Sequence, residues 1–92
     1  MIVRILGEGQ YQLDEVEAAQ LAPLDLELDS AVDRGDEAAF RTALDSAVRL
    51  VRSAGTPLPP DELAASDLIL PSLDASVDDV RKLIADDGIH LG

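Results

Sequence analysis

Two short β-prone runs open the chain. Residues 2–6 are Ile-Val-Arg-Ile-Leu and residues 10–13 are Gln-Tyr-Gln-Leu, and the Gly-Glu-Gly between them supplies two positions that can take positive φ. In the second run Gln10 and Gln12 alternate with Tyr and Leu, which is typical of a strand with one face on helices and the other in water. We therefore expect a β-hairpin over residues 2–13, with the more apolar first strand in a central position.

An approximate apolar stripe predicts helical structure over residues 15–34. Asp14 and Glu17 fit the N-cap and N3 positions of a capping box at its start. Proline has no backbone N–H, so we expect a break at Pro23, with a short helix before it and a second helix starting near it. The stripe consists of Val16, Leu21, Leu24, Leu28 and Val32.

Arg34-Gly35-Asp36 is typical of a helix stop followed directly by a new N-cap, and it predicts a tight antiparallel helical hairpin. The following helix, over residues 37–53, has the clearest periodicity in the chain. Its apolar positions recur at three- and four-residue spacing and are Phe40, Leu44, Ala47, Val48 and Val51.

Glycine and several prolines then predict a loop over residues 54–75. Within it, the Leu-Ile-Leu at residues 68–70 is either an edge strand or irregular coil, and the pattern does not separate the two. Ser76 with Asp79 predicts the start of a last helix over residues 77–86. Whether a final strand follows at residues 89–91 also stays open.

These elements predict a small single domain of the α+β class, in which the β-hairpin packs on the helical hairpin and a C-terminal helix is added. The chain has 92 residues, and 19 Asp and Glu against 7 Lys and Arg give a net charge of −12. Such a charge repels phosphates, and aromatic residues make up only 2%, so we expect no nucleic-acid binding. No cysteine is present, which excludes disulfides and thiolate metal sites.

No uncharged run approaches the roughly 18 apolar residues that a bilayer span requires, and the N-terminal residues lack the features of a signal peptide. We therefore expect a soluble, cytoplasmic chain without direct membrane insertion. Anionic lipids would also repel it, so any association with a membrane should pass through another protein.

Four carboxylates match positions 1, 3, 5 and 12 of a calcium-binding loop. Position 6 would be Ser30 where the sharp turn needs glycine, so we interpret the pattern as a solvated helix face and expect no metal or cofactor. Gly7-Glu8-Gly9 is not followed by a helix and is interpreted as a turn. His90 lies two residues from the end of the chain, where a general base seldom has an orienting partner, and is interpreted as non-catalytic. The four carboxylates are Asp25, Glu27, Asp29 and Asp36.

Three arginines, Arg41, Arg49 and Arg52, are the one basic feature of this acidic chain. With Asp45 they share a polar face of the helix over residues 37–53. Residues 1–35 carry a charge of −6 and residues 54–92 also carry −6, whereas the segment between them is neutral. The arginines either dock an acidic partner helix or form internal ion pairs with the acidic flanking helix.

The order and spacing of several short motifs resemble the PspA-associated protein family, PspAA, over nearly the whole chain. The resemblance implies a small cytoplasmic accessory protein of the phage-shock or envelope-stress system, without enzymatic activity. It also implies PspA as partner, a coiled-coil membrane-remodelling protein similar to ESCRT-III subunits, and carries over no functional residues. The motifs are Met-Ile-Val-Arg-Ile-Leu-Gly-Glu-Gly-Gln-Tyr at the start, Asp-Arg-Gly-Asp-Glu-Ala-Ala-Phe-Arg from Asp33, Gly-Thr-Pro-Leu-Pro from Gly55 and Ser-Asp-Leu-Ile-Leu-Pro from Ser66.

The leading hypothesis is a non-enzymatic acidic adaptor that binds a PspA-type protein and modulates its assembly or membrane engagement. The acidic surface fits this hypothesis because it complements basic helical segments. One alternative is a small ligand- or metal-sensing domain, with a carboxylate site between Asp25 and Asp36 or in the loop from Pro57 to Pro71. The other is a homo-oligomeric structural subunit, whose exposed helix face is buried by a second copy.

Overall fold

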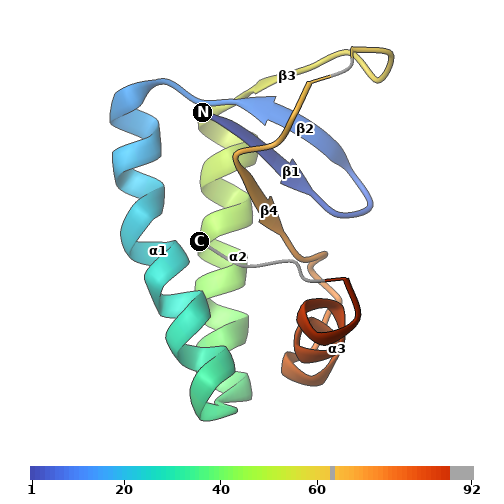
Figure 1. Cartoon of the computed structure of the whole chain (residues 1–92). Coiled ribbons are helices and arrows are strands. Elements are labelled where there is room, and N and C mark those ends of the chain that lie inside the picture. The colour runs from blue at the N-terminus through green and yellow to red at the C-terminus, as the bar shows by residue number, and fades with distance from the viewer. Residues whose placement is uncertain (63, 88–92) are drawn as a thin grey trace.

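The computed structural model describes residues 1–62 and 64–87. The strands of this part form one mixed sheet, and two long antiparallel helices cover one of its faces (Figure 1). A shorter helix lies beside the turn between those two. This arrangement confirms the expected α+β class. The elements are β1 (Ile2–Ile5), β2 (Gly9–Gln12), α1 (Glu15–Arg34), α2 (Glu37–Ala54), β3 (Thr56–Pro57), β4 (Leu68–Leu70) and α3 (Val77–Asp87).

The expected β-hairpin is present as β1 and β2, which pair antiparallel with Ile2 opposite Gln12. Gly7 and Gly9 have φ values of 87° and 137°, a region that favours glycine, so the turn needs both. The strand order is β3-β2-β1-β4, which places β1 inside the sheet as expected.

Residues 68–70 form a strand, which settles the alternative that the sequence left open. This strand, β4, pairs parallel to β1 at the edge of the sheet, with Val3 opposite Leu68. The loop expected over residues 54–75 also contains β3, which pairs antiparallel with β2. The strand considered for residues 89–91, and with it His90, lies outside the described residues.

The helix α1 is continuous from Glu15 to Arg34, so the expected break at Pro23 is wrong. The capping box at its start is formed as expected, with Asp14 and Glu17 exchanging hydrogen bonds of 2.7 and 3.0 Å. Pro23 is exposed, and so is Ala19, whose carbonyl would have accepted the missing N–H. Water can therefore replace the lost hydrogen bond, and the ring causes no clash inside the core.

The apolar stripe expected on α1 is only partly buried. Leu21, Leu28 and Val32 lie in the core, and Leu24 packs against its edge. Val16 is 67% exposed, which corrects the expectation that it belongs to the buried stripe. It lies on the opposite side of the helix, because its five-residue separation from Leu21 does not keep the helical period.

The helices α1 and α2 meet in a tight turn, as the Arg-Gly-Asp sequence predicts. Gly35 takes the left-handed conformation at φ 66°, and Asp36 accepts a hydrogen bond from the N–H of Ala39 as the N-cap of α2. All five apolar residues expected on the inner face of α2 are buried, and Ala43 joins them. Val3 and Ile5 of β1, Leu13 just after β2, and Leu68 and Leu70 of β4 join them in the core.

The alternation of polar and apolar residues predicts that Gln10 on β2 faces water, but its side chain is buried. It is 8% exposed, because the segment after β3 folds over the outer face of the sheet. Its Nε2 donates to the carbonyl of Ala64 over 2.8 Å and to the hydroxyl of Ser66 over 2.9 Å. Gln12, two residues further on the same strand, is exposed as expected.

Candidate partner-binding surface

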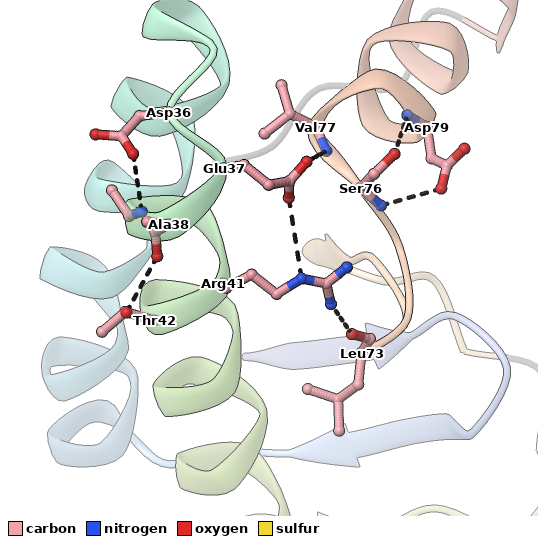
Figure 2. Close-up of polar contacts among 10 residues, drawn as sticks. Asp36, Glu37, Ala38, Arg41, Thr42, Leu73, Ser76, Val77 and Asp79 are labelled. Atoms are coloured by element: carbon pink, nitrogen blue, oxygen red, sulfur yellow. Dashed lines mark hydrogen bonds and ion pairs between the residues drawn. The ribbon is translucent and has the colours of Figure 1, made fainter.

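Arg41, the first of the three arginines on α2, is used to hold the chain that leads into α3. Its Nη1 donates to the carbonyl of Leu73 over 2.6 Å, and its Nε lies 3.9 Å from the carboxylate of Glu37 one turn earlier (Figure 2). Glu37 in turn accepts a hydrogen bond of 3.2 Å from the backbone N–H of Val77 (Figure 2). The two side chains therefore join the first half of α2 to the start of α3.

The start of α3 is itself capped by Ser76 and Asp79, as the sequence predicts. The N–H of Ser76 donates to Asp79 over 3.0 Å, and the N–H of Asp79 donates to the hydroxyl of Ser76 over 3.1 Å (Figure 2). The hydrogen bond from the backbone N–H of Ser76 to the carboxylate of Asp79, followed by one from the Ser76 side chain, lowers the pKa of Asp79 from its ordinary value because both favour the charged carboxylate. The cluster around Arg41 thus serves to position a helix.

The other two arginines also have partners within the chain. Arg52 forms an ion pair with Glu8 in the hairpin turn, and the hydrogen bond to Glu8 raises the pKa of Arg52. Arg49 lies 3.0 Å from Asp45 one turn earlier, and its side chain is 78% exposed. Internal pairing therefore holds for all three, with partners on α2 and in the hairpin turn, not on the acidic flanking helix.

Most of the basic side chains of the chain are held by ion pairs or hydrogen bonds within the chain. The chain has seven Lys and Arg. Four of them form ion pairs, with Arg34 and Asp36 as the remaining pair, and Arg81 is bound to backbone carbonyls at the end of α1. Since 19 carboxylates face so few basic groups, the exposed surface is dominated by negative charge.

The outward side of α1 carries exposed apolar residues that sequence reasoning did not assign to the surface. Met1, Val16 and Leu26 are the exposed large hydrophobic residues of the described part, and the last two lie on this helix. Leu26 is 70% exposed, and Pro23 between them is exposed as well. The sequence contained a signal for this face, because apolar residues recur around α1 on two opposite sides, not in one stripe.

The carboxylates considered for calcium do not form a loop. Asp25, Glu27 and Asp29 lie within α1, and Asp36 caps α2 beyond its end. Within the described residues no three His, Cys, Asp or Glu side chains are placed to hold a metal ion. Burial raises the pKa of Asp25, and the charge of Asp29 one turn away raises it further.

A hollow of about 390 Å³ lies on the outer face of the sheet, beside Gln10 and beneath the proline-rich loop. Arg4 of β1, Glu8 of the turn and Glu62 of the loop contribute charged groups of both signs to its lining. The loop from Pro57 to Pro71 is one of the two places where the sequence leaves a ligand site open, and this hollow lies against that loop. With one guanidinium and two carboxylates, of which Glu8 is already paired with Arg52, the lining indicates no particular class of ligand.

Together, the fold and the surface define a small acidic α+β domain. The family model of PspA-associated proteins, PspAA, matches residues 1–92, the whole chain. The chain therefore belongs to the PspAA family, which links its role to PspA. No curated protein and no solved structure matches it. None of the described helices has the length and apolarity that crossing a membrane requires.

Proposed function

We propose that this chain is a non-enzymatic, cytoplasmic adaptor that binds a PspA-type coiled-coil protein and modulates its assembly or its engagement of the membrane. The observation that supports it most is the imbalance of surface charge in a member of the PspA-associated family. Ion pairs and carbonyl contacts occupy Arg34, Arg41, Arg49, Arg52 and Arg81, and the 19 carboxylates of the chain far outnumber its seven basic groups. Such a surface attracts a partner that presents Lys and Arg.

The shifted pKa values described above have local structural causes, which fits a role without catalysis. Asp25, Arg52 and Asp79, whose pKa values are shifted, lie on three different helices. A local contact accounts for each shift: burial for the first, Glu8 for the second and the helix cap for the third. An acid–base pair would instead bring such groups together in one cleft.

The test is size-exclusion chromatography with light scattering of the full chain, alone and mixed with the PspA-type protein of the same organism. We expect a co-eluting complex at low salt that dissociates at about 1 M salt, where exposed charges are screened within about 3 Å. The chain alone, run at several concentrations, serves as control and measures whether it forms homo-oligomers. Separate elution of the two proteins at low salt would contradict the proposal.

A further inference from the structure

We propose that the outward side of α1 docks a basic amphipathic helix of a partner protein. This side is formed by Val16, Ala19, Pro23 and Leu26, which we call the outer stripe. All four residues are exposed, Val16 to 67% and Leu26 to 70%. The inner side of the same helix is buried on α2, and α1 lies at the periphery of the molecule, with no other described element on its outward side (Figure 1).

The spacing of the outer stripe favours a helix as the occupant. Its residues are separated by three, four and three positions, the 3.5-residue period of a helix–helix seam. The two large residues lie at its ends, and the smaller Ala19 and Pro23 lie between them, so that a partner side chain can insert in the middle. Exposed apolar groups in a row rimmed by polar residues are typical of interaction sites.

The charges beside the outer stripe define the partner's chemistry. Glu15 flanks it on one side and Glu27 on the other, and both are exposed. The only basic residue of α1 is Arg34 in its last turn, where it donates to Ser30 and faces Asp36. A complementary helix therefore carries Lys or Arg beside its apolar seam, as in coiled coils whose flanking charges select the partner.

A second copy of the chain fits this surface poorly. Pairing two α1 helices through their outer stripes brings two acidic flanks together, and neither stripe has a Lys or Arg beside it. Each copy also carries a net charge of −12. Like charges in close apposition disfavour such a pair, so a basic partner is the better occupant.

Pro23 adds a polar group to the outer stripe. It cannot donate to the carbonyl of Ala19, which therefore lacks the donor that an uninterrupted helix would supply four residues later. Ala19 lies at an exposed position of the stripe. A Lys or Arg side chain of the docked helix can donate to this carbonyl at the centre of the seam.

This inference rests on the proposed function for the identity of the partner, and on the outer stripe alone for its chemistry. The experiment measures the affinity of the full chain for the PspA-type protein of the same organism by calorimetry. The test variant is Val16→Gln with Leu26→Gln, which removes the apolar contacts without changing the charge. The matched control is Arg49→Gln, which places the same side chain at an exposed position of α2 and also probes the arginine face.

We expect the double variant to weaken binding by at least about tenfold, and Arg49→Gln to change it by less than about twofold. Because the exposed positions contribute little to the core, all variants should keep the melting temperature of the unaltered chain. An affinity of the double variant within about twofold of that of the unaltered chain would overturn the inference. A loss of affinity in Arg49→Gln that exceeds the loss in the double variant would overturn it as well.

A second experiment distinguishes a failure of this inference from a failure of the proposed function. Two designed amphipathic helices with the same leucine seam, one flanked by Lys and one by Glu, are added to the isotope-labelled full chain, and its amide resonances are followed by NMR. Shifts at residues 15–27 with the Lys-flanked helix alone would support the outer stripe even if the PspA-type protein does not bind. Shifts elsewhere, no shifts, or equal response to both helices would overturn it.

Discussion

The guanidinium of Arg81 on α3 donates to the backbone carbonyl of Val32 near the end of α1, with Nη2 at 2.7 Å and Nε at 3.2 Å from the oxygen. Nη2 also lies 3.4 Å from the carbonyl of Asp33. The last carbonyls of a helix lack intrahelical donors and carry partial negative charge, so a guanidinium is well suited to this place. One side chain thus attaches α3 to the helical hairpin.

We predict that Arg81→Met lowers the free energy of unfolding by about 1.5 to 3 kcal/mol, the range for a hydrogen bond with a charged group. Urea unfolding followed by circular dichroism measures it. Lys82→Met is the matched control, since Lys82 is the next residue of α3 and is exposed, and it should change stability by less than about 0.5 kcal/mol. Equal losses from both variants would show that the contact with Val32 contributes nothing specific.

A second prediction concerns Gln10, which holds the loop over the outer face of the sheet. Gln10→Ala removes the donor to Ala64 and Ser66, and the free energy of unfolding should fall by about 1 to 3 kcal/mol because two partly buried acceptors lose their partner. Faster proteolysis of the loop should accompany the loss. The control is Gln12→Ala on the same strand, whose hydrogen bonds of 3.3 Å are exposed or partly so. If both variants are cleaved at the same rate, Gln10 does not hold the loop.

Local signals predicted most of the fold. The capping residues Asp14, Asp36 and Ser76 determined where helices begin, and the period of α2 determined its buried face, because caps and periodicity depend on neighbouring residues only. The pairing of β4 with β1 could not be predicted, since it joins residues more than sixty positions apart. Such contacts depend on how the whole chain packs.

Two predictions about which residues are exposed are wrong, and they too depend on how distant segments pack. The sequence pattern places Val16 in the core because it is apolar and Gln10 in water because it is polar, whereas Val16 is exposed and Gln10 is buried. Burial depends on which segment covers a position, and the segment that covers Gln10 lies more than fifty residues away. The arginines on α2 could be recognised as a charged face, but the partners of Arg41 and Arg52 lie outside that helix.

Replacing Pro23 should stabilise the folded chain, in contrast to the substitutions at Arg81 and Gln10. Pro23→Ala supplies the missing N–H for the carbonyl of Ala19 and should raise the free energy of unfolding by about 1 to 3 kcal/mol, because proline is strongly unfavourable inside a helix. The control is Pro59→Ala in the loop, which should leave stability unchanged or lower it by up to about 1 kcal/mol through the more flexible unfolded chain. A loss of stability in Pro23→Ala would contradict this account of α1.

The raised pKa of Asp25 predicts that the stability of the folded chain depends on pH. Its raised pKa means that the folded chain keeps a proton at pH values just above 3.8, where the unfolded chain has lost it. This group therefore removes stability as the pH rises through that window. We predict that Asp25→Asn melts at a higher temperature than the unaltered chain at neutral pH, and that the difference vanishes below the ordinary pKa of 3.8. A difference that is independent of pH would contradict the assignment.

The central claim is that this acidic chain binds a PspA-type protein through charge complementarity. The most direct measurement is a calorimetric titration of that protein with the full chain at several salt concentrations between about 0.05 and 0.5 M. The account predicts a saturable complex whose affinity falls steadily as salt rises. The absence of a binding signal at the lowest salt concentration, or an affinity that does not change with salt, would contradict it.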